Sequence, residues 1–528
     1  MASSLGGQPP GVQPPGVRSP DEPGVEPGAE PGGSLRQIAL RSGAYLAGRE
    51  AVGVAVRLAG VVVVVREIGP SAFGVYSAAA LFTLFATGLA QMGTEVYLIR
   101  LPRAPGRRDY DEAFTFLLCT SVLVVAVAEG LTVLVGPWLR PVGVVLPLRI
   151  LLLSIPLNVL WAPAQAFIER SFAYRRMGLL ELGGDVVLYV VAVPAAIGGA
   201  GAWALVAGYF AWQAWLLVGS MVLAGLRPRW AWSPQAFRDL LRHGSGYSLS
   251  TWVTAAERLV IPQVVGSVAG AAGVGYVVFG QRLVQTLSVI QRGVYRIGMV
   301  TVSRIGRDDP GRLGRALEEG SLLLMVAAGA PFAAFGLVAH WVVPAVFGHE
   351  WTAAIPVYVL LAVVAVLTVP NLVQCTVLFA FGKNLQVALA NLIQAVALLI
   401  GSLILVRTVG IVGFGYASLL TLVATLYTRA VASQVAPIRY RRLVLPIVAM
   451  VPPMVAPVLP QPWGLLTALP MGLLFCFPSS RRDLALLVDV VRAGIRWKRP
   501  ARGEGSRHEE PRDAQPRQVG NCEIGNPA

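Results

Sequence analysis

Three arginines interrupt an apolar stretch, residues 271–303, that is long enough to cross a bilayer as a helix. At about 100° per residue, most of its polar side chains fall within an arc of roughly 80°. These are Gln281, Gln285, Ser288, Arg292 and Arg296, with Arg282 at the edge of the arc. An arginine in the middle of a bilayer costs about 2.5–3.5 kcal/mol on insertion scales, so the stripe predicts a solvated cavity rather than contact with lipid. For Arg292 and Arg296 the alternative is a position near the membrane face, from which the side chains extend to water.

Further arginines lie inside other apolar runs, Arg49 and Arg57 in the first run and Arg258 in the seventh. Arginine stays charged in a low-dielectric region, and its planar fork of N–H donors matches phosphate oxygens. The candidates for binding a phosphate-bearing substrate are therefore Arg49, Arg57, Arg258, Arg282, Gln285 and Arg292. The alternative for Arg57 and Arg258 is a structural ion pair, because Glu50 lies two helical turns before Arg57 and Glu257 adjoins Arg258.

Three carboxylates also fall inside expected spans: Glu129, Asp185 and Glu257. An ionisable group within a membrane is a functional candidate, and these three are candidates for a proton or sodium relay. Pairing with arginines on neighbouring helices is the alternative. The four cysteines and four histidines show no spacing typical of metal ligands, so the sequence predicts no metal site and no cofactor.

The composition indicates the class of protein that must position these groups. Of 528 residues, 55% are hydrophobic and 13% are charged, and the mean hydropathy is +0.64, which predicts an all-α polytopic membrane protein. Apolar runs recur along the chain and predict about 14 transmembrane helices of about 20 residues each. Arginines concentrate in the loops after even-numbered runs, so the net charge of +15 reflects membrane topology rather than nucleic-acid binding. Both termini are expected on the cytoplasmic side.

An internal repeat relates two parts of the chain. AVRLAG at 55–60 matches AERLVI at 256–261, which places Arg57 and Arg258 at corresponding positions about 201 residues apart. AFGVY at 72–76 resembles AGVGY at 272–276 at nearly the same offset. Two like-oriented halves of this kind predict a substrate site between them near the membrane midplane. Chance similarity among helices rich in alanine, valine and glycine is the alternative.

The expected organisation follows from the repeat, the apolar runs and the polar ends. We expect a disordered cytoplasmic tail at 1–34, six-helix bundles at 35–226 and 227–435, an extra helix pair at 436–479, an amphipathic cytoplasmic helix at 480–499 and a disordered tail at 500–528.

Five segments carry a resemblance to a known family: EIGPSAFGVYSAA at 67–79, QMGTEVYLIR at 91–100, GSVAGAAGVGYVVFGQRLVQ at 266–285, FGHEWTAAIPV at 347–357 and TVGIVGFGYASLL at 408–420. Through them the chain resembles the multidrug/oligosaccharidyl-lipid/polysaccharide exporter superfamily over about residues 36–435. Within it, the resemblance is to the polysaccharide-biosynthesis flippases of the O-antigen type. The Gly-Pro-x-x-Phe-Gly-x-Tyr element at 69–76 is the most specific of these matches.

This resemblance implies two helical bundles in a V around a central cavity. It also implies export of a polyprenyl-diphosphate-linked glycan across the cytoplasmic membrane by alternating access. No ATP-binding Gly-x-x-x-x-Gly-Lys-Ser/Thr loop is present, and we expect a transporter rather than an enzyme. The other implied partners are membrane lipids and the glycan polymerase or glycosyltransferases of the same pathway. An extra helix pair also suits lipid II flippases, so the resemblance leaves the substrate subgroup open.

Two other functions are considered. A multidrug antiporter for organic cations would share the fold, but cations favour carboxylates and aromatic rings, whereas these spans carry arginines. A membrane glycosyltransferase or glycan polymerase commonly uses acidic residues on a large external loop, and the expected external loops are short.

Overall fold

The computed structural model describes residues 35–101, 103, 105–171, 173–288, 310–434, 443–460 and 463–472. The chain divides into two compact units, Met1–Tyr45 and Leu46–Ala528, and the second unit contains all the candidate spans. The expected tails at 1–34 and 500–528, the amphipathic helix at 480–499 and Arg292 fall outside the described residues. Arg49 lies on a described helix, but its side chain is not among those described.

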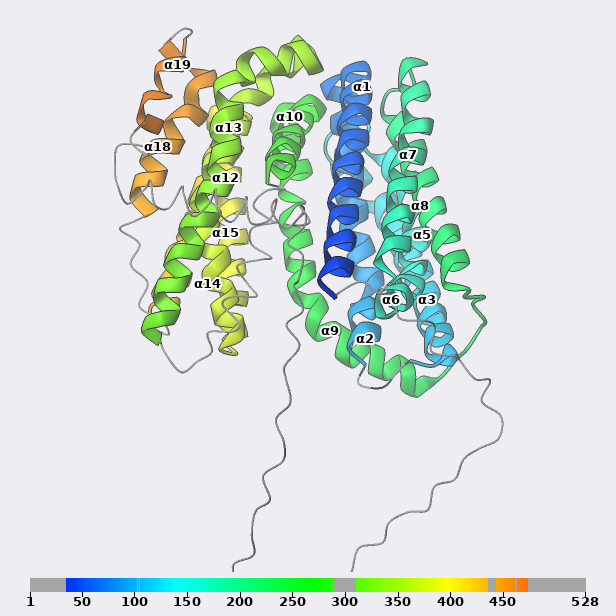
Figure 1. Ribbon diagram of the computed structural model, residues 1–528. Helices are drawn as coiled ribbons and strands as arrows, with labels where there is room; N and C mark the ends of the chain where they lie inside the picture. The colour runs from blue at the N-terminus through cyan, green and yellow to red at the C-terminus, as the bar shows by residue number, and fades with distance from the viewer. Residues whose placement is uncertain are drawn as a thin grey trace, which may run out of the picture. The chain divides into compact units, whose positions relative to one another are not determined.

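Helices form all the regular structure within the described ranges (Figure 1). A helix satisfies its backbone hydrogen-bonding groups within its own segment, which a bilayer requires of any chain that crosses it. The α-helices are α1 Leu35–Gln91, α2 Thr94–Arg100, α3 Arg107–Val135, α4 Val145–Leu152, α5 Ile155–Leu160, α6 Ala162–Arg170, α7 Tyr174–Ile197, α8 Ala202–Ala224, α9 Pro234–Glu257, α10 Gly266–Leu287, α12 Pro310–Phe347, α13 Ile355–Leu367, α14 Val369–Ala380, α15 Asn384–Val409, α16 Val412–Leu420, α17 Leu422–Ala432, α18 Val444–Val455 and α19 Trp463–Leu466. Short tighter or wider turns are η1 Gly136–Trp138, η2 Ile261–Val265, η3 His349–Ala354, η5 Ala456–Val458 and η6 Leu469–Gly472.

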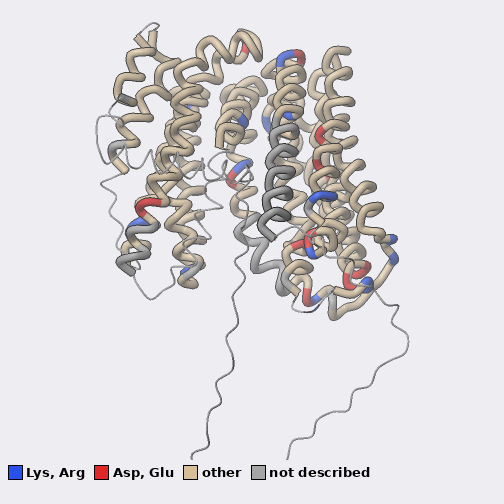
Figure 2. The backbone as a smooth tube through the Cα atoms, in the orientation of Figure 1, with Lys and Arg blue, Asp and Glu red and all other residues tan. Residues whose placement is uncertain are grey.

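Nine helical segments among the described residues are long and apolar enough to cross a membrane. They are Ala55–Gln91, Arg107–Trp138, Val145–Arg170, Arg175–Ile197, Ala202–Ala224, Trp252–Leu287, Leu317–Phe347, His349–Leu367 and Asn384–Val409. Charged positions are sparse along the described helices (Figure 2). The prediction of an all-α polytopic membrane protein is therefore confirmed. The total of about 14 spans, the domain boundaries and the side on which the termini lie stay predictions.

Two glycines kink the helices that carry the repeat. Gly69 has φ 70° and ψ 173° inside α1, and Gly270 has φ 64° and ψ −162° inside α10. Only glycine adopts such a conformation without strain, and Pro70 follows Gly69 as the first residue of the next helical segment. Gly69 therefore divides α1 into two helical segments.

Beyond the kinks, α1 and α10 cross with their backbones in contact. A Cβ placed on Gly74 would lie 1.8 Å from the carbonyl oxygen of Ala271, and a Cβ placed on Gly275 would lie 2.2 Å from that of Pro70. The contacts are reciprocal, because each glycine faces the first turn after the other helix's kink. Small residues permit this approach of membrane helices, as they do in other close helix pairs.

An aromatic cluster surrounds Trp351 of η3 and joins it to α1 and α10. Trp351 of η3 is only 1% exposed, and its ring centroid lies 5.5 Å from that of Phe73 on α1. Two rings of α10 also contact it, Phe279 at 4.5 Å and Tyr276 at 6.1 Å. Contact between these large rings stabilises the packing of η3 against α1 and α10.

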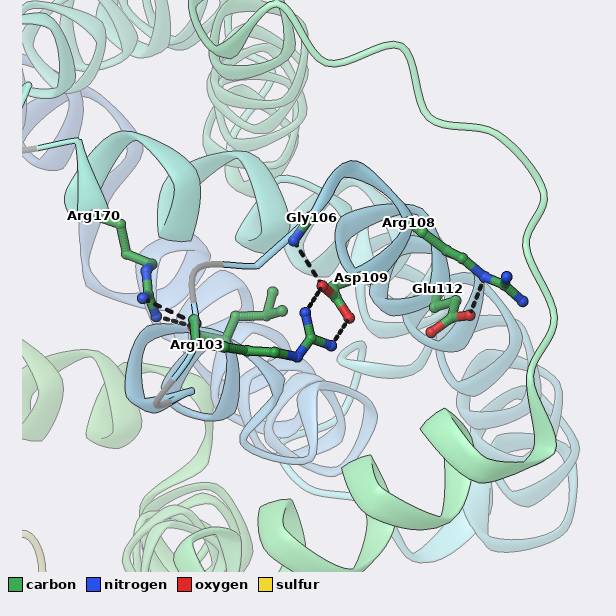
Figure 3. Close-up of polar contacts among 7 residues, drawn as sticks. Arg103, Gly106, Arg108, Asp109, Glu112 and Arg170 are labelled. Carbon is green, nitrogen blue, oxygen red and sulfur yellow. Dashed lines mark hydrogen bonds and ion pairs between the residues drawn. The ribbon is translucent and has the colours of Figure 1, made fainter. Parts of the chain in front are cut away.

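The charged residues near the loop from α2 to α3 hold that loop in place (Figure 3). Arg103 donates to both carboxylate oxygens of Asp109, at 2.6 and 2.5 Å. At the end of α6, Arg170 donates to the backbone oxygens of Leu98 and Ile99, at 3.0 and 2.9 Å. These groups satisfy the open end of a helix and a turn, so their charges have a structural role.

Candidate functional site

A cavity of about 500 Å³ lies between α1, α9, α10, α13, α15 and α16. Its wall combines apolar side chains with a group of polar ones. The polar residues are Tyr76, Ser77, Thr254, Glu257, Arg258, Gln281, Arg282, Gln285 and Gln394. The cavity therefore brings together three of the six expected substrate-binding residues and one of the three expected relay residues.

Helix geometry explains how α10 contributes to the wall. Gln281, Arg282 and Gln285 are one turn or less apart, so their side chains share a face of the helix. Gly280, directly before them, lies against the backbone of Tyr358 on α13, with a Cβ position 3.4 Å from that residue's nitrogen. The close packing of one face on α13 leaves the polar face directed at the cavity.

Arg258 reaches the same cavity from a break between helices. α9 ends at Glu257, and the wider turn η2 begins at Ile261 with Pro262 as its second residue. Glu257 accepts a hydrogen bond from Gln394 Nε2 of α15 at 3.3 Å. The break places the neighbouring Glu257 and Arg258 together in the cavity wall.

The cavity contains more positive than negative charge. Its lining includes the guanidinium groups of Arg258 and Arg282 and the single carboxylate of Glu257. Among the described residues, neither arginine forms an ion pair with a carboxylate. The N–H groups of these arginines could bind an anion that enters the cavity, and the net positive charge would repel a cation.

Arg57 lies outside this lining and pairs with Asp185 of α7. Arg57 Nη1 is 2.6 Å from Asp185 Oδ2, and the side chains are 42% and 14% exposed. Tyr189, one turn after Asp185, interacts electrostatically with both Arg57 and Arg282. Arg282 also interacts electrostatically with Tyr76, which lines the cavity. The ion pair therefore lies on α1 and α7 within electrostatic range of Tyr189, and neither of its residues lines the cavity.

Glu129 occupies a different part of the structure. Its Oε2 is 2.8 Å from Arg149 Nε, and the pair joins α3 to α4. Neither residue lines the cavity. The structure thus shows the helix–helix pairing that was the alternative to a relay function for this residue.

Sequence reasoning did not single out Gln394 or Tyr189. Gln394 is a polar residue inside an apolar run, which is a signal, but such amides usually join helices to each other. Nothing in the sequence around Tyr189 indicates its position, because its neighbours Arg57 and Arg282 are far away along the chain.

The family model described as polysaccharide biosynthesis protein matches residues 63–356, more than half of the chain. The chain belongs to this family. The matched residues include the part of α1 from residue 63 onward and Asp185, which pairs with Arg57. They also include the cavity residues Arg258, Arg282 and Gln285. The resemblance drawn from the sequence is confirmed.

Solved structures show the fold of this polysaccharide biosynthesis protein. It is similar to the lipid II flippase MurJ in an inward closed conformation, with a TM-score of 0.67 and 11% identity over 85% of this chain and 99% of that chain. It is also similar to a multidrug resistance MATE family transporter of the MOP superfamily in an inward-facing conformation, with a TM-score of 0.56 and 17% identity over 72% of this chain and 95% of that one. No curated protein matches the sequence. The exporter fold expected from the sequence is confirmed.

Proposed function

We propose that this protein exports a lipid-linked oligosaccharide or polysaccharide precursor across the cytoplasmic membrane by alternating access. The observation that carries the proposal is the pair of guanidinium groups, Arg258 and Arg282, in one cavity with a single carboxylate. Keeping two arginines within a membrane is costly unless they face a cavity or a partner, and a diphosphate headgroup is a partner of matching charge. The similarity to a lipid II flippase supports a lipid-linked substrate.

The size of the cavity suits the headgroup. About 500 Å³ falls within the range of about 300–1,000 Å³ that is typical of ligand pockets. Arg258 and Arg282 would bind phosphate oxygens, and Gln285 would donate from the next turn of α10. Glu257 would bind a coupling proton or sodium ion in the same space. Arg57 would approach from α1, and Arg49 and Arg292 remain candidates along the path.

The arrangement proposed for the whole chain has two six-helix bundles, 35–226 and 227–435, that rock about the cavity. Both termini would be cytoplasmic, where the precursor is made. The partners would be the polyprenyl-diphosphate-linked glycan, membrane lipids, and the enzymes that assemble or polymerise the glycan.

A multidrug antiporter is the second candidate, because the fold is also that of a MATE transporter. Glu257 would then be the residue that binds the organic cation. The two arginines beside it argue against this function, since they would repel a cation in a region of low dielectric constant.

The test is export in cells that lack the chromosomal gene and express Arg258→Ala, Arg282→Ala or the double variant. We expect normal protein levels in the membrane, accumulation of lipid-linked glycan on the cytoplasmic leaflet and loss of surface glycan. Arg407→Ala is the matched control, because Arg407 is exposed near the end of α15 and does not line the cavity. Normal export by the double variant would refute the proposal. Resistance to cationic dyes conferred by the unmodified protein would favour the antiporter.

A further inference from the structure

The ion pair of Arg57 and Asp185 lies at one end of a row of contacts between α1 and α7. A Cβ on Gly60 would lie 2.2 Å from the ring of Tyr189, so this glycine provides the space that the ring occupies. Further along, Val64 packs in a buried cluster with Ala192, and Ile68 joins the same cluster. Residue numbers rise together on both helices, so the helices run parallel and their register is fixed by apolar contacts.

This register brings Arg57 to Asp185 without requiring that the pair itself hold the helices together. The Gly60–Tyr189 contact and the alanine-rich cluster continue for several turns beyond it. The Arg57 side chain is 42% exposed, so a ligand can approach its guanidinium group. The Asp185 side chain is 14% exposed and would remain poorly hydrated if Arg57 turned away.

The corresponding place in the second half is different. Arg258 occupies the repeat position of Arg57, and the helix that lies beside it, α15, presents an amide, Gln394, which donates to Glu257 at 3.3 Å. Arg258 is exposed in the cavity wall and forms no ion pair with a described carboxylate from α15. In the second half Arg258 therefore lies in the cavity wall, whereas in the first half Arg57 is paired with the carboxylate of Asp185.

We propose that Asp185 is an internal competitor of the substrate: the anionic headgroup displaces Asp185 from Arg57 on binding, and Asp185 takes Arg57 back on release. This inference rests on the proposed function, because it concerns the same diphosphate headgroup. Arg57 and Arg282 both act electrostatically on Tyr189, which supports the proposal that a headgroup bound at Arg282 also reaches Arg57.

This competition lowers the affinity of the protein for the headgroup. A headgroup that takes Arg57 leaves the poorly hydrated carboxylate of Asp185 without that partner, and this cost is subtracted from the gain of binding. A transporter benefits from such a penalty, because a headgroup held too tightly would not leave. Asp185 acts through Arg57 and is a positioning residue in this scheme.

The test measures the affinity of the purified full-length protein for geranylgeranyl diphosphate in detergent. We expect Asp185→Asn to bind the probe about 10-fold more tightly, which corresponds to about 1.4 kcal/mol. Adding Arg57→Gln to this variant should remove the gain. A damaged fold would weaken binding, so tighter binding distinguishes competition from a structural role. In cells, Asp185→Asn should export more slowly despite its higher affinity.

Glu112→Gln is the matched control. It also breaks an arginine–carboxylate pair, with Arg108 at 2.9 Å, but near the start of α3 (Figure 3). Its affinity should equal that of the unmodified protein. Asp185→Ser provides a second variant without the carboxylate if Asp185→Asn is produced poorly.

The outcomes separate the two proposals. If the unmodified protein does not bind the probe, or if Arg282→Ala binds it equally well, the proposed function fails. If binding depends on Arg282 but neither Asp185→Asn nor Asp185→Ser binds more tightly, the proposed function stands and the competition is refuted.

Discussion

The crossing of α1 and α10 leads to a prediction of unusual sharpness, because two glycines face backbone rather than flexible side chains. In Gly74→Ala, the new methyl group would lie 1.8 Å from the oxygen of Ala271. Ordinary contact begins at 3.4 Å, so the helices must separate locally by about 1.6 Å, the difference between these two distances. In Gly275→Ala, the nearest atom is the oxygen of Pro70 at 2.2 Å, and a similar but smaller separation is required.

Overpacking of this kind costs about 1–3 kcal/mol, which exceeds the gain of up to about 1 kcal/mol that alanine brings to a helix. The matched control is Gly130→Ala on α3, where an added Cβ meets nothing within 4 Å. Relative to that control, we expect Gly74→Ala and Gly275→Ala each to lose about 1–3 kcal/mol of stability. The double variant should lose less than the sum, because one separation of the helices relieves both clashes.

The assay is thermal or denaturant unfolding of the purified protein in one detergent, with all variants measured side by side. A second readout is the labelling rate of a cysteine introduced at Ser77 in the cavity wall, which should rise when the crossing loosens. The reasoning would be refuted if Gly74→Ala and Gly275→Ala unfolded at the same point as Gly130→Ala. Strict additivity in the double variant would show that the two contacts are not relieved by one movement.

Three other predictions follow from buried groups. Trp351→Ala should destabilise the protein by about 3–5 kcal/mol in unfolding assays, since Trp351 is 1% exposed; an unchanged midpoint would contradict its place in the packing. Thr428→Val should cost about 0.6–1.7 kcal/mol, because the Thr428 hydroxyl lies 2.6 Å from Asn371 Oδ1; Thr376→Val, at an exposed hydroxyl, should cost less. Burial, assisted by Glu169, raises the pKa of Glu95 from 4.5 to about 7 on α2, outside the nine candidate spans. The folded state then holds the proton more tightly, so stability should fall as pH rises from about 4.5 to 7, and Glu95→Gln should flatten this dependence.

The sequence was sufficient for the class of fold and for part of the cavity wall. Apolar length predicts spanning helices, and a period of 3.6 residues places Gln281 and Gln285 on one face with Arg282 beside them, because both signals are local. The partner of Arg57 could not be predicted in this way. The structure pairs Arg57 with Asp185, whose position depends on packing between helices that are far apart in the chain. The side chain of Glu50, the local alternative, is not among those described.

The break in the helix at Gly69 is a local feature that the sequence does indicate. A Gly-Pro pair such as Gly69-Pro70, between two apolar runs, usually marks a turn. In the structure Gly69, with φ 70° and ψ 173°, separates two helical segments within α1. The local signal for a break was correct, but its size depends on how α1 packs on α10 beyond the kink.

The repeat proposed from sequence gains support from features that the sequence match did not include. The kinks at Gly69 and Gly270 are separated by 201 residues, which is also the separation of Arg57 and Arg258. The reciprocal contacts at Gly74 and Gly275 keep the same separation, and chance similarity of alanine-rich helices would not produce them. Each arginine therefore precedes its kink by the same number of residues. Arg57 and Arg258 thus stand at equal chain distance from the kinks of their halves, but their surroundings differ: Arg57 pairs with Asp185 of α7, whereas α15 beside Arg258 presents the amide of Gln394.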